Sequence, residues 1–291
     1  MRILNYGSLN IDHVYGVRHF VRPGETIDST SYSRFCGGKG LNQSVALAHA
    51  GAEVWHAGKI GAEGKFLKER LVADGVNVDF VEEVTEPTGH AVIQVDSNGE
   101  NAIVIYGGAN RAITRSDAER VLATFSPKDL LLLQNEISAT NDVLALAAAR
   151  GMRVAFNPAP FGPEVSEYPL QSVDLFILNE TEGQGLAGRA GAGAIADALL
   201  TRFPGAAIVL TLGSRGAIYK DGACAFEATA NRVKAVDTTA AGDTFIGFFL
   251  ASYTRGLDVH HCLEVACRAA TLCVTRAGAA DAIPTLAEIG C

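Results

Sequence analysis

The sequence predicts an α/β fold: a doubly wound, mostly parallel sheet flanked by helices, with a small second β-sheet as a lid. Short apolar runs alternate along the chain with longer helical patterns, as in proteins built from repeated strand–helix units. Two segments interrupt this alternation with strands that have no helix between them. A length of 291 residues with 48% hydrophobic content suffices for one large core. We therefore expect a single α/β domain over residues 1–291.

The elements of the main sheet are expected from the period of their apolar residues. Short apolar runs predict buried strands, and apolar residues three or four positions apart predict helices. The expected strands cover residues 3–6, 54–60, 130–134, 154–157, 175–178 and 207–211. The expected helices cover residues 41–50, 65–74, 141–150, 192–202 and 245–253. In such a sheet, ligands bind where the strands reach their carboxyl ends.

The lid sheet is expected from strands at 13–17, 30–34, 90–96 and 101–106. Residues 96–100, Asp-Ser-Asn-Gly-Glu, are typical of the turn of a β-hairpin. The strands form two insertions, at about 12–36 and 88–107, which could close over a ligand. Such a sheet also exposes an apolar face, so we expect a homodimer through the lid sheets.

Charge and composition argue against several classes of function. The net charge of −8 argues against a nucleic-acid groove, which normally needs a basic excess. No apolar run reaches about 18 residues, and the N-terminus lacks the layout of a signal peptide. We therefore expect a soluble, cytoplasmic protein without a membrane partner.

The six cysteines indicate neither disulfides nor a metal motif. None belongs to a C-x-x-C pair, and nothing in the sequence suggests export. Cys262, Cys267 and Cys273 fall in one expected helix, at spacings that distribute them around it. Apolar packing is favoured, and metal or redox chemistry is the alternative.

The most informative segment is residues 237–244, Asp-Thr-Thr-Ala-Ala-Gly-Asp-Thr, at the start of an apolar helix. Small residues there leave the first helical amides free at the positive end of the helix dipole, which favours an anion. Asp243 would lie against a bound phosphoryl group, where a carboxylate is useful as a base for an attacking hydroxyl. The pattern predicts phosphoryl transfer to an alcohol, with Ala240, Ala241 and Gly242 as the anion hole.

Three further segments carry groups that suit a polyol. Residues 37–40, Gly-Gly-Lys-Gly, allow close approach of a ligand, and Lys39 and Asn42 add donors; the alternative is a turn with a solvated lysine. This is not a P-loop, because glycine follows Lys39. Asn10 and Asp12 project to one side of an extended chain, although the pair could equally cap a turn. Glu136 follows the strand at 130–134 and faces its carboxyl end.

Two strand ends suit a nucleotide. Asn179 and Glu182 could hold a hydrated divalent cation, or could instead cap a helix. The turn that contains Thr211 and Gly213 could meet a nucleotide with its backbone. Residues 183–188 match the G-x-G-x-x-G pattern by letter, but the first glycine lies too far beyond the strand for a dinucleotide fold.

These segments, in this order, resemble the ribokinase/phosphofructokinase-B family of carbohydrate kinases. The resemblance runs from Gly7 to Pro284 and rests on residues 7–13, 37–43, 157–160, 179–182, 211–216, 235–244 and 274–279. It implies an ATP-dependent kinase with an alcohol acceptor. The implied sugar-binding positions carry the residue types that the family uses for D-ribose, so the implied reaction is phosphorylation of the 5-hydroxyl of D-ribose.

The resemblance also assigns roles to individual positions. The implied sugar ligands are Asn10, Asp12, Gly38, Lys39, Asn42 and Glu136, with Asp243 as the base. The implied nucleotide site comprises Asn179, Glu182, Thr211, Gly213 and the amides of Ala240, Ala241 and Gly242, with Mg²⁺ held largely through water near Glu182. An activating K⁺ is implied at Asp237 and Thr239, with backbone groups around Arg276 and Gly278.

Rival functions remain open from the sequence. A kinase of the same family acting on deoxyribose, fructose or a nucleoside such as adenosine or inosine is the main alternative. A non-catalytic sugar-sensing homologue would keep the fold, but the presence of Asp243 argues against it. An NAD-dependent oxidoreductase would rest only on the rejected glycine pattern, and a purely structural protein would leave the polar clusters unexplained.

Overall fold

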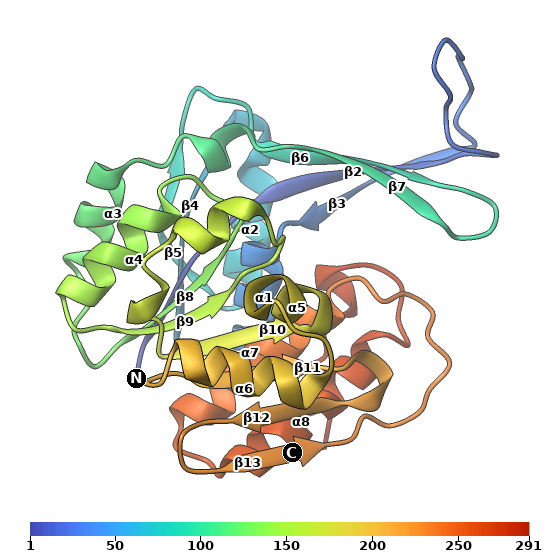
Figure 1. Cartoon of the computed structure of the whole chain (residues 1–291). Helices are drawn as coiled ribbons and strands as arrows, with labels where there is room; N and C mark the ends of the chain where they lie inside the picture. Colours follow the sequence, from blue (N-terminus) through green and yellow to red (C-terminus); the bar gives the residue numbers. More distant parts are fainter. Residues whose placement is uncertain (291) are drawn as a thin grey trace.

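Nine strands form the main sheet of the computed structural model, which describes residues 1–290 (Figure 1). Their order is β13-β12-β11-β10-β9-β8-β1-β4-β5. The strands from β11 to β5 pair in parallel, and β12 and β13 add an antiparallel edge. The bounds are β1 (Ile3–Tyr6), β4 (Val54–Ile60), β5 (Asn77–Glu83), β8 (Leu130–Gln134), β9 (Arg153–Asn157), β10 (Leu175–Asn179), β11 (Ala207–Thr211), β12 (Ala217–Lys220) and β13 (Ala225–Ala228). The predicted doubly wound, mostly parallel sheet is confirmed.

Helices cover both faces of this sheet and create two apolar cores. One core contains α1 (Lys39–His49), α2 (Lys65–Ala73), α7 (Ala241–Thr254) and α8 (Val259–Cys273). The other contains α3 (Arg115–Leu122), α4 (Thr140–Ala149), α5 (Glu180–Ala187) and α6 (Ala192–Arg202). Successive strand residues point to opposite faces, so Leu132 enters the first core and Leu133 the second. This is why the buried strands are apolar without interruption.

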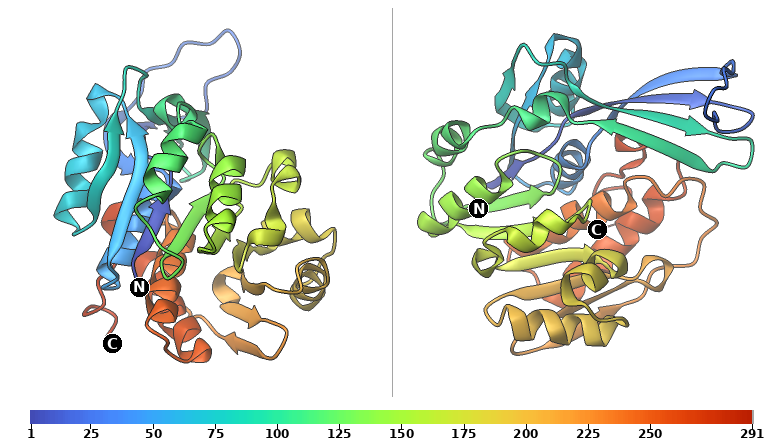
Figure 2. Two further views of the ribbon diagram at one scale, coloured as in Figure 1. Left: turned by 90° about the vertical axis from the view of Figure 1, so that its left-hand side faces the viewer. Right: turned by 45° about the horizontal axis from the view of Figure 1, so that its top comes forward.

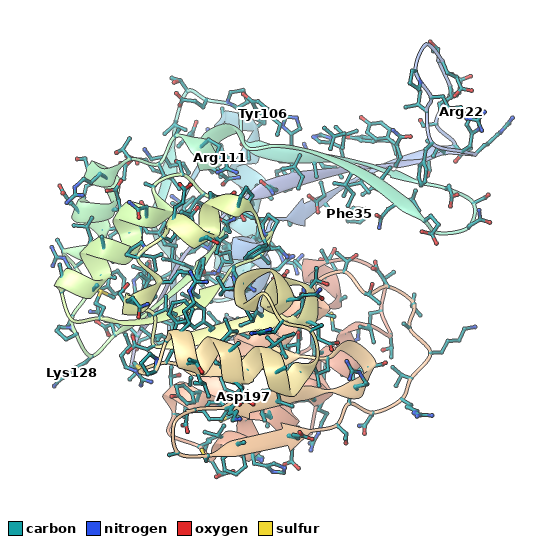
Figure 3. All side chains as sticks on the ribbon, viewed as in Figure 1. Arg22, Phe35, Tyr106, Arg111, Lys128 and Asp197 are labelled. Atoms are coloured by element: carbon teal, nitrogen blue, oxygen red, sulfur yellow. The ribbon has the colours of Figure 1, made fainter. Side chains whose placement is uncertain are left out.

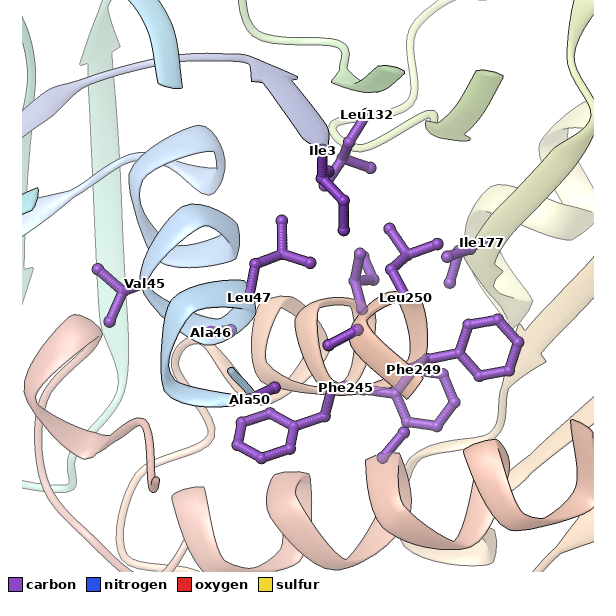
Figure 4. Packing of buried hydrophobic residues seen from close by; sticks show 14 of the residues in the cluster. Ile3, Val45, Ala46, Leu47, Ala50, Leu132, Ile177, Phe245, Phe249 and Leu250 are labelled. Atoms are coloured by element: carbon purple, nitrogen blue, oxygen red, sulfur yellow. The ribbon is translucent and has the colours of Figure 1, made fainter. Parts of the chain in front are cut away.

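Helix α7 lies between α1 and α8, and Leu47, Ile177, Phe249 and Leu250 belong to the apolar cluster that these helices share with the sheet (Figure 4). Helices α1 and α7 approach closely at Gly247. A Cβ added there would lie 2.4 Å from Cβ of Ala46 and 2.7 Å from the amide nitrogen of Leu47. This packing brings the first turns of α1 and α7, both of which carry predicted site residues, side by side.

A separate four-stranded sheet projects from one edge of the main body (Figure 2). Its order is β3-β2-β6-β7, with β2 and β6 parallel and the outer pairs antiparallel. The bounds are β2 (Asn10–Gly16), β3 (Ser31–Gly37), β6 (Gly89–Val95) and β7 (Asn101–Tyr106). In the β6–β7 turn, the amide of Asp96 donates to the carbonyl of Glu100 at 3.0 Å, and Gly99 adopts φ 81°. We call this sheet the lid.

Several element predictions need correction. Helix α7 begins at Ala241 rather than 245, so Asp243 lies inside its first turn. Strand β2 begins at Asn10 rather than 13, because the lid pairing extends to Asn10 opposite Gly37. Strands β5, β12 and β13 and helices α3 and α5 were not predicted. These elements are short, and most of them are polar on one side, so their apolar period is weak.

Smaller expectations are also resolved by the fold. Gly183 and Gly185 lie inside α5 and Gly188 ends it at φ 64°, so this glycine pattern is a helix and not a dinucleotide loop. The five cysteines within residues 1–290 are free thiols, and Cys262, Cys267 and Cys273 are buried in α8; Cys291 lies outside the described residues. Over the same residues, no helix has the length and apolarity needed to cross a bilayer.

Candidate active site

A cleft of about 230 Å³ opens where β9, β10 and β11 reach their carboxyl ends, beside the first turn of α7. Its lining joins side chains that are far apart in the sequence. The predicted site residues among them are Lys39, Asn179, Glu182, Thr211, Ala240, Gly242 and Asp243. Gly213 follows Thr211 in the next turn but does not line this cleft.

The first turn of α7 has the geometry of an anion site. Ala240 caps the helix in the left-handed conformation, φ 59°, which is costly for a residue other than glycine and is found at sites where function requires it. The hydrogen bond from the amide of Ala241 to the carbonyl of Thr238 is long, at 3.3 Å, and Gly242 lines the cleft. The positive end of the helix dipole therefore points into the cleft.

Asp243 is 7% exposed, and two side-chain amides hold its carboxylate. Nδ2 of Asn42 donates to Oδ2 at 3.1 Å, and Nε2 of Gln43 donates to Oδ1 at 2.8 Å. Both donors come from the first half of α1. The close packing of α1 on α7 therefore positions the carboxylate at the wall of the cleft.

The turn before α1 brings its backbone against β1 and β2, and only glycine permits this. A Cβ on Gly40 would lie 2.3 Å from the amide nitrogen of Ser8, and a Cβ on Gly37 would lie 2.1 Å from Oδ2 of Asp12. Gly38 adopts φ 93°. The glycines thus let this backbone pack directly against Ser8 and Asp12.

Glu136 connects this turn to the end of β8. Its Oε2 accepts hydrogen bonds from the amide of Lys39, at 2.9 Å, and from the hydroxyl of Ser8. The side chain of Lys39 lies in the cleft, and the negative charge of Asp243 raises the pKa of its ammonium group, with smaller contributions from Glu136 and Glu182. A cation thus stands among three carboxyl groups.

Asp12 and Glu136 face each other across the base of the lid. Burial, reinforced by the charge of Glu136, raises the pKa of Asp12 to about 7. Burial also raises the pKa of Glu136, although Lys39 opposes the shift. Two half-buried carboxyl groups that interact electrostatically favour a ligand that brings hydroxyl donors to them.

Asn110 was missed by the sequence analysis. It is 1% exposed, and its Nδ2 donates to Oδ1 of Asn10 at 2.7 Å. The same amide pairs with the backbone of Leu9, because Oδ1 accepts from the amide of Leu9 at 3.0 Å. Asn110 therefore fixes the amide of Asn10. The sequence signal was weak: a Gly-Gly-Ala-Asn run directly after β7.

Asn179 and Glu182 form a helix cap, which is the alternative left open from the sequence. Oδ1 of Asn179 accepts from the amide of Glu182 at 2.9 Å, and Oε2 of Glu182 accepts from the amide of Asn179 at 3.0 Å. Both side chains nevertheless line the cleft, and burial raises the pKa of Glu182. Within residues 1–290, no cluster of three or more His, Cys, Asp or Glu side chains could enclose a metal ion.

The residues predicted for a monovalent cation lie together beside the anion site. Oδ1 of Asp237 accepts from the amide of Thr239 at 2.8 Å, and Oδ2 accepts from the amide of Gly278 at 3.0 Å. Burial opposes the charge, but these hydrogen bonds outweigh it and keep the pKa of Asp237 below its usual value. The side chain of Arg276 instead pairs with Glu288 at 2.6 Å, so only its backbone is available to this loop.

The sequence matches the model of the pfkB family carbohydrate kinases over residues 2–286. A ribokinase of Schizosaccharomyces pombe is 37% identical over 99% of this chain and 96% of its own length. A ribokinase of Haemophilus influenzae is 35% identical over 97% of this chain and 95% of its own length.

Solved structures share the whole fold. Ribokinase from Cryptococcus neoformans in complex with ADP superposes with a TM-score of 0.87 at 34% identity, over 99% of this chain and 98% of that one. Arabidopsis thaliana ribokinase complexed with ribose and ATP also gives a TM-score of 0.87, at 30% identity over 99% and 96% of the two chains.

Proposed function

The chain belongs to the pfkB family of carbohydrate kinases, and we propose that it transfers the terminal phosphoryl group of ATP to the 5-hydroxyl of D-ribose. The products are ribose 5-phosphate and ADP. The observation that carries the proposal is the position of Asp243, between the anion site of α7 and the polar base of the lid. The ribokinases of similar sequence and fold support ribose as the acceptor.

The sugar would lie among Asn10, Asp12, Lys39, Asn42 and Glu136. Asp12 and Glu136 accept hydrogen bonds from hydroxyl groups, and Gly38 lets the ring approach the backbone. Oδ1 of Asn42 is buried and has no hydrogen-bond partner within residues 1–290. An unsatisfied buried acceptor is costly, and a sugar hydroxyl would satisfy it.

Proton removal and charge stabilisation would be divided between two groups. Asp243 accepts the proton of the 5-hydroxyl group. At the same time the oxygen of that hydroxyl forms a bond to the terminal phosphorus of ATP, and the bond from this phosphorus to ADP breaks. The amides of Ala241 and Gly242 and the ammonium group of Lys39 stabilise the negative charge of the phosphoryl oxygens. Positioning and electrostatics supply most of the catalysis in such transfers.

The nucleotide would follow the cleft from Ala240 to Asn179, Glu182, Thr211 and Gly213. Mg²⁺, when bound with ATP, neutralises phosphate charge and keeps most of its water, so one carboxylate such as Glu182 is enough to hold it. The buried carboxyl group of Glu182 and its place on the cleft fit this role. Because ATP is the donor, we place the reaction in the cytoplasm.

We assign K⁺ activation to the loop that joins Asp237 and Thr239 to the backbone of Arg276 and Gly278. Asp237 supplies a carboxylate of low pKa, and the loop leads directly into the anion site. A cation bound there would fix the conformation of the helix cap at Ala240.

The lid would provide closure and a dimer contact. In-register pairing places Phe35, Ala91 and Ile105 on the same face as Asp12, and Ile103 continues this apolar face. Figure 3 labels Phe35 on the projecting lid. Phe35, Ile103 and Ile105 are 36%, 51% and 58% exposed. Because this face carries no charge beyond Asp12, whereas the opposite face carries Arg34, we propose that it packs against a second lid.

The substrate is tested by ADP release with Mg²⁺-ATP, with and without K⁺, for ribose, deoxyribose, fructose, adenosine and inosine. We expect turnover that requires a sugar, is fastest with ribose and is stimulated by K⁺. Preference for another acceptor would overturn ribose while leaving the kinase mechanism intact. Equal rates with and without K⁺ would overturn the cation site, and rapid ATP hydrolysis without sugar would contradict a closing lid.

A further inference from the structure

A chain of buried side-chain amides extends from Asp243 toward β1 and β8. Gln43, whose Nε2 donates to Oδ1 of Asp243, is fully buried and does not line the cleft. Its Oε1 accepts from Nε2 of Gln134 at 2.6 Å, and Gln134 also donates to Oδ1 of Asn5 at 2.9 Å. Nε2 of Gln43 also lies 3.2 Å from Oδ1 of Asn157. The chain ties α1, β1, β8 and β9 to one carboxylate.

We propose that Gln43 is a positioning residue that orients the carboxylate of Asp243 for proton abstraction, and that Gln134 fixes Gln43 in that orientation. The inference rests on the proposed role of Asp243 as base. Asn42, the other donor to Asp243, also faces the sugar, so its amide must serve two partners. Gln43 does not line the cleft, so its donation to Oδ1 does not compete with a bound hydroxyl.

The chain cannot carry the proton away from the base. A carboxamide donates its hydrogens but has no ionisable proton to pass on, so transfer through Gln43 and Gln134 would require an unstable tautomer. Beyond Asn5, the chain reaches Ser44, whose hydroxyl lies 2.8 Å from Nδ1 of His56. Burial lowers the pKa of His56 to about 4, so this imidazole is neutral at physiological pH. These neutral groups therefore orient the carboxylate of Asp243, and the charges that act on it come from other residues.

The buried thiol of Cys273, in α8, interacts electrostatically with Asp243, and burial raises the pKa of this thiol. The charged groups that interact with Asp243 lie on other elements. They are the ammonium group of Lys39 and the carboxyl groups of Glu136 and Glu182. A substitution at Gln43 leaves all three in place. Its effect therefore reports the lost hydrogen bond and the freed carboxylate rotamer, because no substrate contact changes.

The test compares Gln43→Met and Gln43→Glu with wild type in steady-state kinetics from pH 5.5 to 9. Gln43→Met keeps the volume but removes the donor, so we expect kcat to fall about 10–10²-fold, with both KM values within about twofold. Gln43→Glu donates only when protonated, so its kcat should fall as pH rises over the range where wild-type kcat is constant.

Asp129→Asn is the control, because it removes the ion pair of buried Asp129 with partly exposed Arg2, just before the opposite end of β8. It should lower stability and leave both pH profiles and KM values unchanged. A wild-type kcat in folded Gln43→Met would overturn the proposal. If Gln43→Met does not fold, a wild-type pH dependence of kcat in Gln43→Glu would overturn it. Every variant is assayed with the acceptor that gives the highest kcat/KM with wild type. A wrong substrate assignment therefore appears in the wild-type comparison of acceptors, separately from this test.

Discussion

Among single residues, Asp12 has a raised pKa, and its proposed role as a sugar ligand predicts that sugar binding depends on pH. Its pKa of about 7 means that the carboxylate loses its charge just below neutrality. Sugar hydroxyls donate to the ionised form, so the Kd for ribose should rise as pH is lowered through about 7. Isothermal titration with ribose from pH 5.5 to 8.5 measures this. A ribose affinity independent of pH over that range would contradict the assignment.

The same shift has a cost in stability. The folded state keeps the proton of Asp12 that the unfolded chain releases from about pH 4 upward, so the free energy of unfolding falls between pH 4 and 7. Asp12→Asn should therefore have a higher Tm than wild type at pH 8, and the difference should vanish near pH 4. Asp197→Asn is the control for the loss of one negative charge, at an exposed carboxylate that pairs with Lys220.

Asn110 gives a second prediction at this scale. Asn110→Asp keeps the shape and the acceptor for the amide of Leu9 but loses the donor to Asn10. The ribose KM should rise about tenfold, in keeping with the loss of one buried hydrogen bond, while the ATP KM stays constant. The same substitution at exposed Asn98, in the lid turn, should change neither. An unchanged ribose KM in Asn110→Asp would show that Asn10 needs no support.

Sequence reasoning found the proposed ligand-binding residues better than the residues that position their side chains. Glu136, Asn179 and Thr211 end parallel strands, and the ends of parallel strands share one edge, so their gathering was predictable. Gln43 and Asn110 were missed as supporting groups because their partners lie far away in the chain. Gln43 is 200 positions from Asp243, and Asn110 is 100 from Asn10. Only the packing of α1 on α7 and of the lid on the body brings these pairs together.

Among the elements, the contact of α1 with α7 decides where the base stands. Gly247→Ala should destabilise the protein by about 1–3 kcal/mol although alanine favours helices, because its Cβ would press on the backbone of α1. Gly193→Ala, in α6, has nothing within 4 Å of its Cβ and should stabilise by about 0.5–1 kcal/mol. Urea unfolding of both variants measures this. A stabilised Gly247→Ala would mean that the helices are not in close contact.

The burial of each element explains which elements could be predicted. The central strands are buried on both faces, so their apolar runs are long enough to recognise, and β1, β4, β8 and β11 were predicted at their observed bounds. Edge strand β5 alternates buried Val81 with exposed acids, and helix α3 depends on a capping box between Thr114 and Asp117. Such elements depend on neighbours and caps more than on their own period.

For the whole molecule, the lid predicts the oligomeric state. Wild type should be a dimer at micromolar concentration, and Ile105→Lys should be a monomer because it places a charge on the proposed contact face. Val104→Lys is the matched control: it is the preceding residue of β7, 70% exposed, on the opposite face. Sedimentation velocity distinguishes the two. A monomeric wild type, or dissociation by Val104→Lys alone, would contradict the proposed contact.

The most direct test of the account is the ribose-dependent kcat of Asp243→Asn. Asparagine keeps the shape of the side chain and the cleft but cannot take the proton of the 5-hydroxyl. We predict a fall in kcat of at least about 10²–10⁴-fold, with ADP binding retained. A kcat within a few-fold of wild type would show that Asp243 is not the base, and would contradict the mechanism built on the first turn of α7.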